Sequence, residues 1–144
     1  MAEDAERRRA DLTERANYHV EAMRRRDEEE SAKAQVLLDR FVEQAKQAAL
    51  PTEELTARPW SGRGRYRTGV VGWYLLRNRS VGVGVDGSYY LLTVPPVRFG
   101  LVRTVRIHPT PPPLQVGKGA RDGESFALAE LLEMRLHWPA AAEG

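Results

Sequence analysis

The chain has 144 residues, of which 42% are apolar and 29% are charged, as in an ordinary soluble globular protein. It contains no cysteine, which excludes disulfides, thiolate zinc sites and thiol nucleophiles. The N-terminus enters charged residues at once, and no apolar run approaches the roughly 20 residues needed to span a bilayer. We therefore expect a cytoplasmic protein without membrane contact, and its preference for arginine over lysine indicates a GC-rich bacterial genome.

Charge is distributed unevenly, although the net charge is only +2. Residues 1–50 carry 10 basic and 12 acidic groups, and residues 111–144 carry 3 and 5. Residues 51–110 carry 9 basic and 3 acidic groups, a net charge of +6. This middle segment is therefore the part of the chain that would attract an anionic partner.

A long N-terminal helix is predicted in residues 1–50, because residues 5–49 lack glycine and proline and are rich in helix formers. Up to Ala32 charge runs dominate, and opposite charges stand three and four residues apart. Such pairs support a solvated helix, which forms a coiled-coil arm or frays. From Ala34 onward apolar residues recur at helical spacing and predict a docking face. These residues are Leu37, Leu38, Phe41, Val42, Ala45, Ala48 and Ala49.

Three further segments follow from the distribution of proline, glycine and apolar residues. Residues 51–66 are predicted as a connector, because proline and glycine interrupt every periodicity there. Within it, Trp60 is expected to anchor the connector to the folded body. Residues 67–138 are predicted to form a small α+β domain, and residues 139–144 a disordered tail.

Two tight turns, Asn78-Arg79 and Asp86-Gly87, organise the predicted domain. Asp-Gly favours a hairpin, because a type I′ turn needs positive φ at both central residues. Two-residue loops at both turns would pair Gly84 with Trp73 and with Tyr89 in a three-stranded meander. One sheet face would then carry Trp73, Leu75, Tyr89 and Leu91 around Gly82 and Gly84. The other would carry Tyr74, Leu76, Val81, Val83, Tyr90 and Leu92.

Both faces of this sheet are apolar, so each needs a cover. One cover is the helix at residues 34–49. The other is a C-terminal helix over residues 124–136, with Asp122 or Ser125 as the N-cap. Before this helix we expect a strand at 101–107, a proline-rich turn and a short strand at 114–116. The predicted fold class is α+β, with an antiparallel β-meander of three to five strands, a C-terminal helix and a long N-terminal helix.

Three groups of residues are candidate binding sites. Arginines among aromatic residues of the basic middle segment provide what single-stranded nucleic acid needs, although a solvated rim around core aromatics is the simpler alternative. A loop at 117–123 stands between a strand and a helix, where backbone amides can bind an anion, but a plain flexible loop explains it as well. A sheet face that neither helix covers would be a partner site. The candidate nucleic-acid contacts are Arg63, Arg65, Arg67, Arg77, Arg79, Arg103 and Arg106; the candidate anion loop is Lys118, Gly119 and Arg121; the candidate partner face is Trp73, Leu75, Tyr89 and Leu91.

No catalytic or metal-binding pattern is present, and no cofactor is predicted. The three histidines are isolated in sequence, and no nucleophile, metalloprotease or histidine–carboxylate motif occurs. Residues 106–112 match an R-x-x-P-x-x-P peptide ligand, but a rigid connector explains them more simply.

The sequence therefore predicts a non-enzymatic interaction or adaptor protein whose helical arm binds a protein partner or a second copy. The alternatives are a nucleic-acid or ribosome-associated binder using the basic segment, and a small-molecule or phosphate site at residues 117–123.

Overall fold

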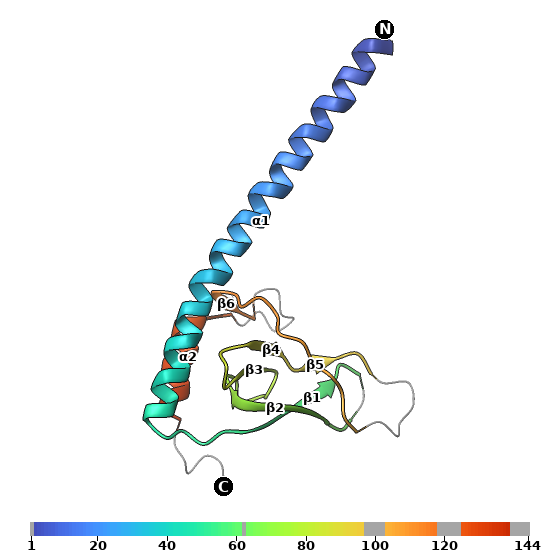
Figure 1. The fold of residues 1–144 in the computed structure, drawn as a ribbon. Coiled ribbons are helices and arrows are strands. Elements are labelled where there is room, and N and C mark those ends of the chain that lie inside the picture. The colour runs from blue at the N-terminus through green and yellow to red at the C-terminus, as the bar shows by residue number, and fades with distance from the viewer. Residues whose placement is uncertain (1, 62, 97–102, 118–124, 139–144) are drawn as a thin grey trace.

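The computed structural model describes residues 2–61, 63–96, 103–117 and 125–138. A long helix, α1 (Ala2–Gln47), precedes a mostly antiparallel five-stranded sheet, and a short helix, α2 (Leu128–Leu136), follows it (Figure 1). The predicted α+β fold class is confirmed. The sheet contains β1 (Glu53–Pro59), β2 (Tyr66–Tyr74), β3 (Val81–Gly84), β4 (Tyr89–Leu91) and β5 (Thr93–Val94); a separate antiparallel pair contains β6 (Gln115–Val116) and β7 (Phe126–Ala127).

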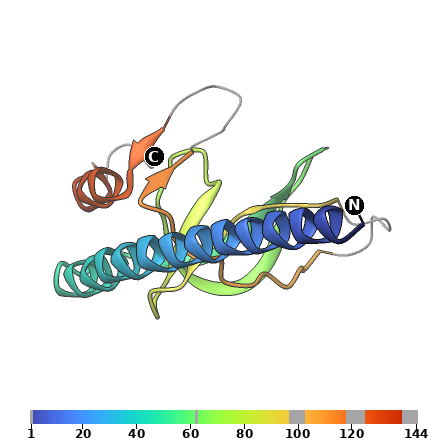
Figure 2. The ribbon, with the colours of Figure 1, turned by 90° about the horizontal axis from the view of Figure 1, so that it is seen from above.

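Helix α1 divides into two parts with different surroundings. We call residues 2–29 the arm, residues 30–47 the docked part, and the described residues that follow α1 the body. The arm projects away from the body as a straight helix, and nearly all of its residues are exposed (Figure 1 and Figure 2). The docked part buries one stripe of side chains against the body, as the spacing predicted. The buried residues are Ala34, Leu38, Phe41, Val42 and Ala45.

The sheet curls until its two ends nearly meet. Its strand order is β4-β3-β2-β1-β5, and β5 follows β4 after the single residue Leu92. The Leu92 backbone N–H donates to Ser80 O, beside β3, and its carbonyl accepts from Arg58 N of β1, both at 2.8–2.9 Å. One continuous segment thus pairs with β3 at one end and with β1 at the other. This closure leaves few free strand edges.

The hairpin registers differ by one residue from those predicted. Trp73 pairs with Val83, and Val83 with Tyr89. The second loop has three residues, because Gly84 N bonds Ser88 O and Gly87 takes φ +89°, a type I turn followed by a left-handed glycine. The first loop has five residues, closed by the bond from Leu75 N to Val81 O. Side chains alternate between the two faces of a sheet, so a register shift of one residue places every β3 side chain on the face opposite to the predicted one.

The correct register moves the β3 glycines to the inside of the curled sheet. A Cβ on Gly82 would lie 2.9 Å from Leu55 Cδ1 and 3.2 Å from Leu92 Cδ1, so a larger residue would require these two side chains to shift. This interior cluster consists of Leu55, Tyr74, Tyr90 and Leu92, with Val70 and Ile107 packed against it. The predicted floor of glycine beneath Trp73 and Tyr89 is therefore wrong.

Both helices cover the same outer face of the sheet. Phe41 of α1 and Leu128 of α2 share one cluster with Trp73, Leu75 and Tyr89. The prediction of one helix on each face is therefore wrong. The inner face is closed instead by the curl of the sheet and by Ile107.

Several local predictions also need correction. Residues 51–66 are not merely a connector, because β1 lies within them and buries Leu55 and Ala57. Trp60 does not anchor this segment, since it is 68% exposed. Residues 103–107 form only an isolated bridge at Thr104 rather than a strand.

The predicted short strand at 114–116 is confirmed as β6, but α2 begins four residues later than predicted. Its N-cap is Ala127, without a side-chain cap, because Phe126 and Ala127 pair with β6 instead. Of the two predicted caps, Ser125 does not cap the helix and Asp122 lies outside the described residues, as do 139–144. In the part of the chain that the structure describes, no helix has the length and apolarity that crossing a membrane requires.

Candidate functional site

The arm carries an apolar stripe on the same helix face as the docking stripe, separated from it by Asp27 and Glu30. Ala16, Val20 and Met23 each stand 18 residues before a buried residue of α1, namely Ala34, Leu38 and Phe41. Eighteen residues are five turns of an α-helix, so both sets lie on the same helix face. The docked set is buried, whereas Val20 is 64% and Met23 62% exposed. Leu12, 64% exposed, extends this arm stripe toward the N-terminus.

Polar contacts mark the place where the body begins to cover α1. The Glu30 carboxylate accepts a hydrogen bond from the Leu114 backbone N–H at 3.0 Å. One turn later, Gln35 Nε2 donates to the Gly87 carbonyl at 2.8 Å and tethers the β3–β4 loop. The arm stripe therefore ends at a defined boundary, beyond which the same face is occupied by the body.

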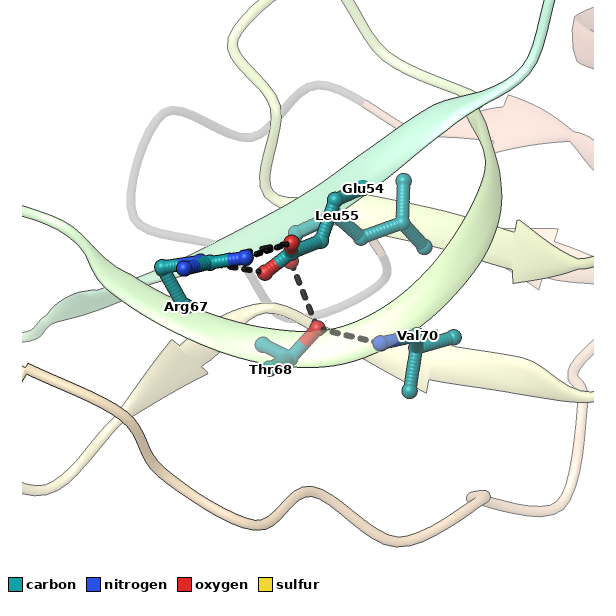
Figure 3. A network of polar contacts seen from close by, with 5 residues as sticks. All are labelled: Glu54, Leu55, Arg67, Thr68 and Val70. Carbon is teal, nitrogen blue, oxygen red and sulfur yellow. Dashed lines mark hydrogen bonds and ion pairs between the residues drawn. The ribbon is translucent and has the colours of Figure 1, made fainter.

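The β1–β2 hairpin carries three of the seven arginines predicted as nucleic-acid contacts, Arg63, Arg65 and Arg67. Glu54 pairs with Val71 and Thr56 pairs with Arg67. Three residues of β2, 68–70, therefore lie opposite the single residue Leu55, which makes a bulge in β2. The Thr68 hydroxyl donates to the Leu55 carbonyl and accepts from Val70 N–H, which stabilises this irregularity (Figure 3).

Arg67 forms an ion pair across the hairpin with Glu54, with Nη2 and Oε1 2.8 Å apart (Figure 3). The hydrogen bond from Arg67 lowers the pKa of the Glu54 carboxyl below its usual value. Arg65 is half-buried and donates from Nε to the Thr56 hydroxyl and from Nη2 to the Thr56 carbonyl. Both guanidinium groups are therefore held against the hairpin surface.

The remaining predicted arginines divide between two places. The Arg103 carbonyl accepts from Arg67 N at 2.8 Å, so residues 103–106 run beside the start of β2. The guanidinium group of Arg77 lies over the Trp138 ring, 5.2 Å from its centroid, and that of Arg79 lies over the Tyr74 ring, 5.6 Å from its centroid. The structure thus does not bring all seven arginines together.

The predicted partner face is not available to a partner. Trp73, Leu75 and Tyr89 are at most 2% exposed, because α1 and α2 pack on them. This burial raises the pKa of Tyr89 to about 12. Only Leu91 of the predicted set is exposed. The candidate anion-loop residues Lys118, Gly119 and Arg121 lie outside the described residues.

A groove of about 320 Å³ lies at the base of the arm, between Glu30, Leu91 and the proline segment at 110–113. The proline segment is held by the bond from Thr110 N to Tyr89 O, which agrees with a rigid connector. Within the described ranges, no group of three or more histidine, aspartate or glutamate residues is placed to hold a metal ion.

The sequence prediction missed two features of these surfaces. The 18-residue offset between arm stripe and docking stripe was visible in the sequence but was not used. Arg58 and Trp60 were assigned to a connector, although buried Leu55, Ala57 and Pro59 alternate with them. Comparison of the chain with protein-family models, with curated proteins and with solved structures gives no match.

Proposed function

We propose that this chain is a non-enzymatic interaction protein that self-associates through its arm. The observation that carries the proposal is the arm stripe, which lies on the same helix face as the docking stripe but is not covered by any residue that the structure describes. Most of the stability of helices in proteins comes from packing of an amphipathic face. A second arm supplies a matching apolar face.

The position of the body favours an antiparallel pair. In a parallel, in-register pair, two arms meeting through this face would bring both bodies into the same space, because each body occupies that face from Glu30 onward. An antiparallel pair that sets Leu12 against Met23 of the second copy places the bodies at opposite ends. The two docked segments then do not overlap.

Charge does not by itself select an orientation. With Leu12 against Met23, residues whose numbers sum to 35 lie opposite one another, and opposite charges across such an interface are stabilising. Three pairs of opposite charge are matched by three pairs of like charge. The opposite pairs are Arg7 with Glu28, Arg8 with Asp27, and Asp11 with Arg24; the like pairs are Glu6 with Glu29, Arg9 with Arg26, and Glu14 with Glu21. The position of the bodies therefore carries the preference for the antiparallel pair.

Substitution of the arm stripe tests self-association in the full chain. Val20→Glu/Met23→Glu should convert a concentration-dependent dimer to a monomer, because buried unpaired carboxylates are costly. The matched control is Ala10→Glu/Tyr18→Glu, which adds the same charge on the opposite helix face. Light scattering during size-exclusion chromatography gives the mass. A wild-type monomer at the highest concentration reached, or a control that dissociates equally, would refute the proposal.

Cysteine cross-linking tests the orientation, since the chain has no cysteine of its own. In the antiparallel pair Leu12 lies about 16 Å from its own copy along the axis, at 1.5 Å per residue. A disulfide needs Cα atoms within about 7 Å. Leu12→Cys and Met23→Cys should therefore cross-link on oxidation only when the two variants are mixed. Cross-linking of either variant with itself would indicate a parallel pair.

A further inference from the structure

The outer face of the β1–β2 hairpin combines arginines with an exposed tryptophan. In β1, Leu55, Ala57 and Pro59 are buried, so Arg58 and then Trp60 point outward. Opposite residues of an antiparallel pair share a face, and alternate residues do so as well. The pairing of Thr56 with Arg67 therefore places Arg65 and Arg67 on the same outer face. We call Arg58, Trp60, Arg63, Arg65 and Arg67 the basic hairpin.

Among the described residues, an ion pair neutralises the charge of this surface at one position only. The Glu54 carboxylate pairs with Arg67, and no acidic residue occurs between Leu55 and Val85. Arg58 and Arg63 are exposed, and the segment with Arg103 and Arg106 lies along the other edge of β2. The hairpin therefore presents a strip with an excess of positive charge.

Trp60 gives this strip a chemical preference. Its side chain is 68% exposed, although its backbone N–H is fixed by a 2.9 Å bond to the Val94 carbonyl. A large aromatic ring exposed to solvent directly after β1 offers a flat apolar face. Cationic groups bind phosphates, and aromatic rings stack on bases, which is the combination found in proteins that bind single strands.

We propose that the basic hairpin binds single-stranded nucleic acid, with the arginines on the phosphates and Trp60 stacked on a base. A single strand fits better than a duplex, because bases in a duplex stack on one another and offer no free face to Trp60. Arg77 and Arg79 are left out of this site, because their guanidinium groups lie over the rings of Trp138 and Tyr74. This site is separate from the arm and does not depend on self-association.

Fluorescence anisotropy with labelled 20-mers of oligo(dT) and oligo(U) measures the binding directly. Trp60→Ala should weaken binding by about tenfold, within the range known for loss of one stacked base, while Trp60→Phe retains most of the affinity. Equal losses for both substitutions would exclude stacking. Because Trp60 is exposed, neither change should affect folding, which circular dichroism verifies.

The salt dependence of affinity tests the arginines. The slope of log K against log salt concentration for a single strand is about −0.7 per phosphate contact. Arg58→Ala/Arg63→Ala should lower the slope by about 1.4 in magnitude. The matched control is Arg40→Ala/Lys46→Ala, which removes the same charge from exposed positions of α1.

Three results would overturn the proposal. The first is that neither oligonucleotide binds at about 20 mM salt, a concentration at which contacts between arginines and phosphates are only weakly screened. The second is an equal loss of affinity in the α1 control, which would indicate attraction to the whole molecule. The third is binding of phosphatidylserine vesicles that Trp60→Ala and Arg58→Ala/Arg63→Ala abolish while oligonucleotides compete poorly.

Discussion

The two parts of helix α1 have apolar residues at corresponding positions of one face but opposite surroundings. Ala34, Leu38 and Phe41 are almost fully buried, whereas the corresponding residues five turns earlier, among them Val20 and Met23, are exposed. Helical spacing thus predicts that a face can be buried, but the rest of the fold decides whether it is. The exposed stripe of the arm is the feature on which the proposed self-association rests.

The charged residues between the two parts explain where the change occurs. Residues 27–30 are all acidic, and only Glu30 of this run has a bond to the body. The acidic run interrupts the apolar face of α1 on the N-terminal side of Ala34, so the body has no apolar side chain to pack against there. The following variants test this contrast, from the largest expected effect to the smallest.

Replacement of a large apolar residue by alanine should change the free energy of unfolding much more in the docked part than on the same face of the arm. Phe41 packs edge-to-face on Trp73, with ring centroids 5.7 Å apart. Phe41→Ala should lower the free energy of unfolding by about 3–5 kcal/mol, as for other large aromatic residues in cores. Met23→Ala should change it by less than about 0.5 kcal/mol in the monomer. Urea unfolding at low protein concentration measures both, and similar losses would show that the arm folds as part of the body.

The burial of Tyr89 in the cluster formed with the docked part should make the free energy of unfolding depend on pH. Burial raises the Tyr89 pKa to about 12, against about 10 in the unfolded chain. The folded state therefore keeps the proton longer, so this stability is complete below pH ~10 and is lost as the pH rises toward 12. At 1.36 kcal/mol per pKa unit the loss is about 2–3 kcal/mol.

Two matched variants isolate this titration. Tyr89→Phe should flatten the decline in unfolding free energy between pH 10 and 12, whereas Tyr18→Phe in the arm, whose ring is 67% exposed, should leave it unchanged. Urea unfolding across this pH range provides the measurement. An unchanged decline in Tyr89→Phe would show that another group causes it.

Replacement of Glu30 should lower the free energy of unfolding more than replacement of its neighbours in the acidic run. Its carboxylate accepts from Leu114 N–H at 3.0 Å, whereas Glu29 is exposed. Glu30→Ala should cost about 1 kcal/mol, because it leaves a half-buried N–H without its charged acceptor. Glu29→Ala removes the same charge and should have little effect on unfolding. Equal effects would mean that the charge of the run, rather than this bond, fixes the boundary.

The fold class and the outer helices could be predicted from the sequence because long-range details do not alter them. The absence of breakers in residues 5–49 and the stripe at Leu38 and Phe41 directly reflect helix geometry. The hairpin register could not be obtained in the same way. Asp86-Gly87 suits both a two-residue type I′ turn and a three-residue loop with Gly87 in the left-handed region, and one residue separates the two registers.

The candidate surfaces were harder to predict for a related reason. β1 contains Pro59 at its end and only two fully buried hydrophobic residues, Leu55 and Ala57, so its period of two is weak in isolation. Trp60 therefore looked like an anchor. Its exposure depends on which strand face the curl of the sheet turns inward, and that is set by pairing with β2 and β5.

The smallest expected effect lies in the ion pairs of the arm. Arg24 contacts Glu21 at 2.7 Å and Glu28 at 3.9 Å, and its side chain is 64% exposed. Exposed helical pairs contribute about 0.3–0.5 kcal/mol, and salt screens them. Arg24→Ala should therefore lower the helical circular-dichroism signal slightly in the monomer and leave the urea transition of the body in place. Because alanine is itself the best helix former, a substantial loss of helix would mean that these ion pairs, rather than backbone propensity, hold the unpaired arm together.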